Sequence, residues 1–130
     1  MIGFSLYPHH LKNGSQCTLS DFCLMIAKSA DKYGIRSLGI GSDLCQDQPD
    51  SIVEWMRVGR WSKTIDYGEG TPDNPGFPKQ PEWFTDNRDF KNIEKGLADV
   101  GFDRDEIEAI MGKNWYNFYT DNFVGLDCKI

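Results

Sequence analysis

The sequence predicts an α/β fold in which two short parallel strands are joined by a helix. Three observations support this fold class: an apolar run at residues 2–7 that Pro8 ends, a helical spacing of apolar residues over 19–33, and a second short run at 35–43. A strand, a helix and a strand in this order form a βαβ unit, in which the strands are parallel and the crossover is right-handed.

The helix between the two strands has the strongest signal in the chain. Its apolar residues recur three and four positions apart, which places them on one helical face. Thr18 and Asp21 resemble a capping box at its start, and Gly34 suits the position after its last turn. The residues on the predicted buried face are Leu19, Phe22, Cys23, Ile26, Ala27, Ala30 and Tyr33.

Two further parts of the βαβ unit contain residues that favour turns or bends. Residues 9–17 are predicted to form a polar turn around Asn13 and Gly14. In the second strand, Gly39 and Gly41 lower the strand propensity but permit a bend or a close backbone approach. The βαβ unit is therefore assigned to residues 1–43.

Residues 44–87 form a connection of a different kind, with five of the six prolines of the chain. Connections this long are usually functional or disordered. Within it, residues 51–59 are predicted to form a short helix, capped by Ser51 and Glu54. The aromatic residues favour an ordered connection, because their surface gains by packing. They are Trp55, Trp61, Tyr67, Phe77, Trp83 and Phe84.

Residues 88–124 are predicted to be helical. Apolar residues space out one face from Phe90 to Val100, and Asp103 with Glu106 caps the next helix. Gly112 and Asn114 are predicted to form a turn before a last helical stretch, and the C-terminal tail is expected to be frayed. The three segments together are expected to form a single domain or a fragment of one.

Length, charge and cysteine pattern exclude several classes. The chain has 130 residues, whereas a closed eight-stranded βα barrel needs about 200–250. The formal charge of −6 argues against nucleic-acid binding, and no apolar run is long enough for a membrane segment. No signal peptide is evident, so a cytoplasmic location is expected. The four cysteines lack zinc-knuckle spacing and are expected to be reduced.

Asp43 is the first candidate for a functional residue, because it ends the second predicted strand directly before the long connection. In parallel α/β folds, ligands gather beyond the carboxyl ends of the strands. A carboxylate there can accept a proton or hold a substrate ammonium. The alternative is an aspartate that only caps a turn. Tyr7 closes the first strand and is a second candidate for substrate contact.

His9 and His10 follow the first strand and are expected on the same rim, where together with an acid they could hold a metal. Adjacent side chains on an extended segment point in opposite directions, which favours a solvated or packed pair instead. Further along, Arg57 and Arg60 could clamp a substrate carboxylate or stack on neighbouring tryptophans. No metal ligand is assigned from the sequence.

Three stretches of the chain resemble the C-terminal part of the renal (membrane) dipeptidase family of zinc metallopeptidases. The likeness begins in IGFSLYP, continues through TLSDFCLMIAKSADKYGIRSLGIGSD, and resumes in PEWFTDNRDFKNIEKGLADVGFDRDEIEAIMGKNWYNFY. The run QPDSIVEWMRVGRW is similar to a bacterial branch of that family. The order and spacing of these stretches, rather than any single motif, carry the resemblance.

The resemblance implies a function and an incomplete site. The family folds as a TIM-type (β/α)8 barrel and hydrolyses dipeptides with water activated by two zinc ions. Asp43 matches the family's acid at the last strand, which binds the amino end of the substrate and transfers the proton. The family's metal ligands precede the matched region, so this chain corresponds to the last two βα units and is expected to be inactive alone, without stoichiometric zinc.

An incomplete barrel has open strand edges, which are expected to be covered by other copies of the chain or by a companion N-terminal fragment. The sequence leaves open whether the chain is a truncated gene product. The other interpretation is a non-catalytic α/β module for oligomerisation or binding that has lost the metal centre.

Overall fold

The computed structural model describes residues 1–44, 51 and 78–123, and these fold around a two-stranded parallel sheet. β1 spans Ile2–Ser5 and β2 spans Leu38–Gly41, paired in register from Ile2 with Leu38 to Ser5 with Gly41. The predicted parallel pairing is confirmed.

Both strands are shorter than the sequence indicated. A single 3-10 turn, η3 (Ile35–Ser37), replaces the first part of the predicted second strand. After β1, the Ser5 hydroxyl accepts a hydrogen bond from the Tyr7 backbone N–H at 3.1 Å. This N–H is therefore satisfied locally by a side chain and not by the ladder, which explains the early end of the strand.

The segment between β1 and the helix is a pair of short 3-10 turns, η1 (Pro8–His10) and η2 (Gly14–Gln16). Asn13 adopts the left-handed conformation with φ 63°, as asparagine tolerates well. The predicted turn around this residue is confirmed.

The helix α1 spans Leu19–Tyr33 and agrees with the prediction. The Thr18 hydroxyl accepts a hydrogen bond from the Asp21 N–H at 3.0 Å, and Gly34 ends the helix with φ 78°. Phe22, Cys23 and Ile26 lie on its buried face. The burial of Cys23 raises the pKa of its thiol to about 12, so it packs as a small apolar group.

Two further helices follow the connection, α3 (Phe90–Asp99) and α4 (Arg104–Glu108). The predicted capping box at the start of α4 is present, with Asp103 and Glu106 bonded reciprocally. α3 lies against α1 at Gly96, where a Cβ atom would come within 2.7 Å of the Cys23 Sγ. Glycine is therefore required for this close approach of the two helices.

The predicted turn at Gly112 and Asn114 is confirmed at Gly112, whose backbone is not helical, whereas Asn114 begins the helix that follows. A wide π-type turn, η5 (Ala109–Lys113), leads directly into α5 (Asn114–Phe123). Gly112 has φ 177° and ψ −29°, so two helical segments meet there at a kink. Asn114 is buried and bonded to the sheet, which holds the kinked segment in place.

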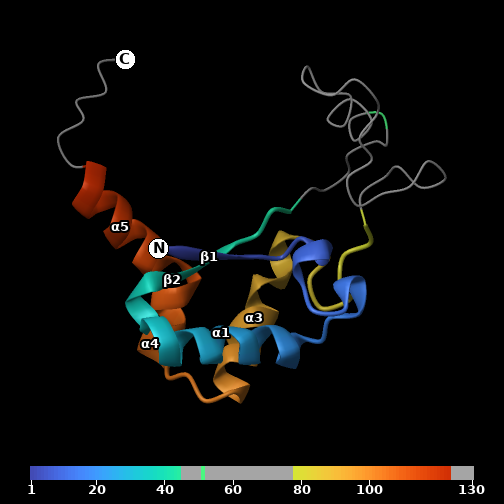
Figure 1. The fold of residues 1–130 in the computed structure, drawn as a ribbon, viewed down its shortest axis with the longest axis horizontal. Coiled ribbons are helices and arrows are strands. Elements are labelled where there is room, and N and C mark those ends of the chain that lie inside the picture. The colour runs from blue at the N-terminus through green and yellow to red at the C-terminus, as the bar shows by residue number, and fades with distance from the viewer. Residues whose placement is uncertain (45–50, 52–77, 124–130) are drawn as a thin grey trace.

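The sheet has two different faces. Phe4 and Leu38 project into the apolar core that α1 and α3 complete. On the opposite face, Gly3 and Gly39 are paired side by side beneath the Trp115 ring of α5. Figure 1 shows α1 and α3 together on one side of the strands, with α5 leaving near the N-terminus of the chain.

Several predictions fall outside the described residues: the helix at 51–59 beyond its first residue, Arg57 and Arg60, and the C-terminal tail. The end of the long connection is described and ordered by aromatic packing. Phe84 is fully buried, and the Trp83 ring centre lies 5.3 Å from that of Phe22. The Trp83 indole N–H also donates to the Cys17 carbonyl at 2.6 Å.

Candidate functional site at the carboxyl end of the sheet

Tyr7 and Asp43 lie beyond the same edge of the sheet. The last paired residues are Ser5 and Gly41, and each candidate stands two residues further along its own segment. The expectation that Asp43 ends the strand is corrected: it lies beyond β2, is exposed, and has φ 49°. Aspartate tolerates this left-handed conformation, which lets the chain turn away from the sheet.

The segment after β1 forms a small polar and aromatic cluster. The Ser5 hydroxyl, besides accepting from the Tyr7 N–H, lies 3.0 Å from the His10 Nδ1. The Tyr7 ring centre is 5.6 Å from that of His9 and 5.3 Å from that of His10. The tautomer of His10 decides which of the two groups donates, so the cluster adds hydrogen-bonding groups to the rim.

The two histidines were predicted to be a packed or solvated pair, and the ring contacts confirm packing. The physical reason differs from the one expected, because both residues lie on the 3-10 turn η1 and not on an extended segment. Among residues 1–44, 51 and 78–123, no three side chains of histidine, cysteine, aspartate or glutamate come together as a metal site. The described residues therefore do not fit a two-zinc centre, which needs several protein ligands.

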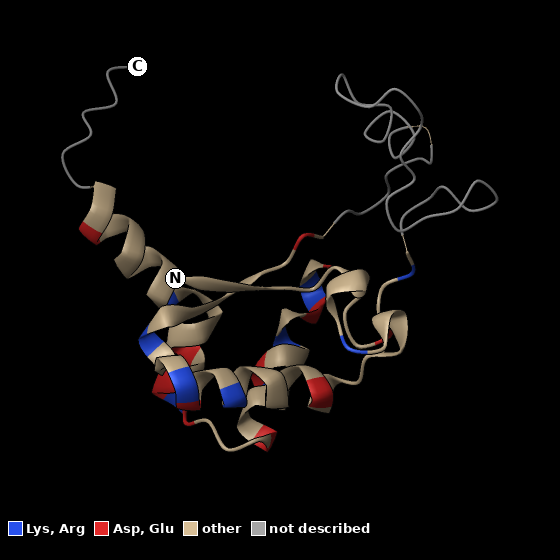
Figure 2. Cartoon of the chain, viewed as in Figure 1, with Lys and Arg blue, Asp and Glu red and all other residues tan. Residues whose placement is uncertain are grey.

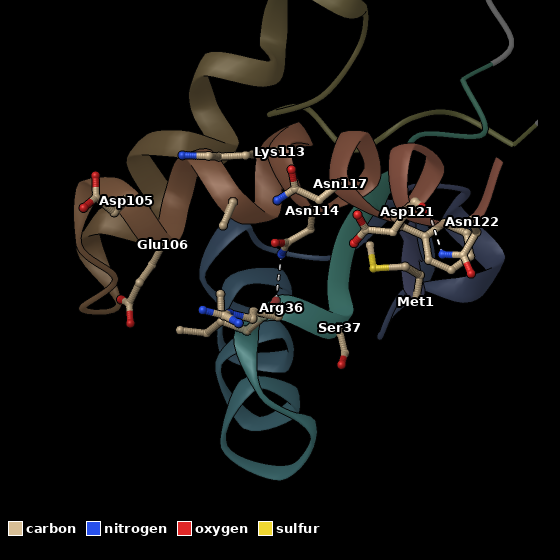
Figure 3. A pocket seen from close by; sticks show the side chains of 13 residues that line it. Met1, Arg36, Ser37, Asp105, Glu106, Lys113, Asn114, Asn117, Asp121 and Asn122 are labelled. Atoms are coloured by element: carbon tan, nitrogen blue, oxygen red, sulfur yellow. Dashed lines mark hydrogen bonds between the residues drawn. The ribbon is translucent and has the colours of Figure 1, made fainter. Parts of the chain in front are cut away.

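A cavity of about 830 Å³ lies at the opposite, amino end of the sheet (Figure 3). Basic, acidic and amide side chains mix in its lining, so its charge favours no single class of ligand. Neither Tyr7 nor Asp43 lines it. The lining includes Arg36, Lys113, Asp105, Asp121, Asn114 and Asn117.

Asn114 and Trp115 join the C-terminal helical segment to β2, Asn114 at its amino end and Trp115 further along the strand. The Asn114 amide donates to the Ile35 carbonyl at 2.8 Å and to the Leu38 carbonyl at 2.9 Å, as Figure 3 shows for the first bond. The Trp115 indole N–H donates to the Ile40 carbonyl at 3.0 Å. Sequence reasoning missed both roles, because each partner lies some 75 or more positions away in the chain.

Basic and acidic residues are interspersed along the described helices and turns (Figure 2). Lys12 with Asp21, Lys95 with Asp99, and Arg104 with Glu108 form exposed ion pairs at 2.9, 2.8 and 3.1 Å. Exposed pairs of this kind contribute little to stability. In the described segments, no helix is both long enough and apolar enough to cross a membrane.

Comparison with known proteins gives one informative likeness. No protein-family model matches the chain, and no curated protein matches it. Among solved structures, the chain is similar to a crystal structure of an amidohydrolase from Pseudomonas aeruginosa, with a TM-score of 0.74 and 22% sequence identity. The match covers 92% of this chain and 35% of that one. The chain thus has the fold of about one third of that protein and spans only that share of its length.

Proposed function

We propose that this chain supplies the rim of a hydrolase site, built on the last two βα units of a TIM-type barrel related to zinc dipeptidases. The observation that carries the proposal is the shared edge: Tyr7 and Asp43 follow the carboxyl ends of two parallel strands. Substrates of parallel α/β enzymes bind at that edge. The likeness to about one third of an amidohydrolase supports the same placement.

The proposed substrate is a dipeptide with a free amino end. The exposed carboxylate of Asp43 would bind the substrate ammonium and exchange a proton with the reacting groups. Tyr7 would line the other side of the rim, held by the hydrogen bond between its N–H and the Ser5 hydroxyl. Each role requires only groups that the described residues present at this edge.

A metal would have to be held by residues outside the described part of the chain. We therefore propose that the chain alone binds no stoichiometric zinc and hydrolyses no dipeptide, and that it works in an assembly with other chains. The second candidate function is a non-catalytic module for oligomerisation or binding. It is favoured because no described group of histidine, cysteine, aspartate or glutamate side chains fits a metal.

Titration of the ¹⁵N-labelled full chain separates the two functions. We compare a dipeptide with a free amino end and the same dipeptide acetylated at its amino end, in wild type and in Asp43→Asn. A hydrolase rim should show shifts at Tyr7, Ser42 and Asp43 for the free-amine dipeptide alone, and the substitution should remove them. Equal responses to both peptides, or no response, would support the non-catalytic module.

A further inference from the structure

We propose that a second copy of this chain docks head to tail, by placing the outer flank of its α3 and α4 against the outer flank of α1. Two grooves carry the proposal, one on each flank of the helical layer. They are lined by apolar side chains and differ in the sign of their charge. The inference concerns how copies meet, and it does not depend on the role of Asp43.

The first groove, called here the basic groove, lies on α1 and has a volume of about 470 Å³. Leu24, Met25 and Tyr33 contribute apolar surface, and two of them are well exposed: Leu24 by 45% and Tyr33 by 51%. Three lysines border the groove, against a single aspartate, in a chain whose net charge is −6. They are Lys12, Lys28 and Lys32, and the acid is Asp21.

Within the basic groove, Lys12 is already paired with Asp21 at 2.9 Å. The positive charge offered to a partner therefore comes from Lys28 and Lys32, both exposed. They lie on the flank of α1 away from α3, because Cys23, which contacts Gly96 of α3, is about half a turn around the helix. This flank is one end of the helical layer.

The second groove, called here the acidic groove, lies on α3 and α4 and has a volume of about 620 Å³. Its apolar floor consists of Ala98, Phe102, Ile107 and Met111. Two glutamates and one arginine border it, and that arginine, Arg104, is paired with Glu108 at 3.1 Å. The remaining glutamate is Glu94, which is exposed and lies on the flank of α3 away from Gly96.

The sheet offers a matching pair of edges. In the described part of the chain, β1 and β2 pair only with each other, so each strand has one edge without a strand partner. Strand edges of this kind are templates for pairing with another chain.

The occupant is a second copy, because one chain carries both halves of the contact. These are two apolar grooves of comparable size whose bordering residues carry charges of opposite sign. Complementary rims favour the correct partner and register more than they add affinity. The two grooves differ, so the contact is heterologous. A pair of docked copies therefore still has one basic groove and one acidic groove free. Repeating such a contact builds a ring or an open chain, and in both cases association should grow with concentration.

Two charge-reversal variants of the full chain test the contact by light scattering at low salt. Variant A, Lys28→Glu with Lys32→Glu, loses the basic rim, and variant B, Glu94→Lys with Glu108→Lys, loses the acidic rim. Wild type, of 14.8 kDa, should exceed twice its monomer mass as concentration rises. Each variant alone should associate about tenfold more weakly or worse. Mixed in equal amounts, they should associate again, because opposite charges meet at both contacts: the unchanged acidic groove of A with the unchanged basic groove of B, and the two reversed rims with each other.

The control is Arg36→Glu with Lys113→Glu, which changes the charge by the same amount as variant A but lies at the amino-end cavity. It should associate far more strongly than variant A, and circular dichroism should show all variants folded. A monomeric wild type, a mixture that stays monomeric, or a control as weak as variant A would each overturn the proposal.

Discussion

The two ends of the sheet differ in how their side chains are used. At the amino end, the buried Asn114 side chain donates to two carbonyls, and the half-buried Trp115 ring covers the adjacent pair of glycines. At the carboxyl end, Asp43 is exposed, and Tyr7 follows a strand that ends early. In parallel α/β folds, the amino end of the sheet serves stability, and ligands bind beyond the carboxyl end.

The difference also appears in the glycines of the two strands. A Cβ atom at Gly39 would lie 2.3 Å from the Trp115 Nε1, whereas at Gly41 no described atom lies within 4 Å. The two residues are two positions apart on the same face of β2. Among the described residues, this face of β2 is therefore packed at Gly39 and open at Gly41, and Gly41 leads to the candidate rim.

The largest expected effect is at Asn114. Replacing it with alanine removes two hydrogen bonds and leaves the Ile35 and Leu38 carbonyls without their donor. We expect a loss of about 2–4 kcal/mol in the free energy of unfolding, measured by urea denaturation. Asn117→Ala, an exposed change on the same helix, is the control and should cost less than about 0.5 kcal/mol. Equal losses in both variants would contradict the structural role of the amino end.

The next effect distinguishes the two glycines. Gly39→Ala should cost about 1–3 kcal/mol, because the added methyl group meets the Trp115 ring and the ring must move. Gly41→Ala should be close to neutral by the same measurement, since the open half of the face has room for it. A larger loss at Gly41 than at Gly39 would reverse the assignment of packed and open halves.

A smaller effect concerns the start of α3. The side-chain hydrogen bond from Arg88, followed by one from the Arg88 backbone, lowers the pKa of Asp86 from 3.8 to about 2. Because the folded state holds this proton less tightly, the stabilisation is complete above pH 3.8 and is lost as the pH falls through about 2. Thermal unfolding of Asp86→Asn should depend less on pH in this window than that of wild type. Salt should reduce the difference, because the pair is exposed.

The smallest effect on stability is expected at Asp43. It is exposed and beyond the strand, so Asp43→Asn should change the free energy of unfolding by less than about 0.5 kcal/mol. The same variant should lose its response to a free-amine dipeptide. A large loss of stability would assign Asp43 to the cap of a turn, the alternative that the sequence left open.

Local signals account for the parts of the fold that the sequence predicted well. α1, α3 and the box of Asp103 with Glu106 follow from apolar spacing and from residues at most a few positions apart. The contacts of Asn114 and Trp115 with the sheet could not be predicted, since they join segments far apart in the chain. The break at Gly112 was predicted because glycine and asparagine favour turns, but the kink that joins the two helical segments was not.

The candidate site was predictable in place but not in detail. The parallel order of the strands was sufficient to put Tyr7 and Asp43 at one edge. The pairing of Ser5 with His10 was not evident, because it depends on the 3-10 turn after β1. Turns of this kind follow from the packing of Pro8 and the Tyr7 ring, which no periodicity encodes.

Residue-resolved amide hydrogen exchange on the full chain, with and without a free-amine dipeptide, tests the contrast between the two ends most directly. The amides of the strands beneath Trp115 should exchange slowest in both samples, and the dipeptide should slow exchange only around Tyr7 and from Ser42 to Leu44. Protection by the dipeptide around Asn114 and Lys113 instead would place the ligand at the amino end and contradict the assignment of the carboxyl rim.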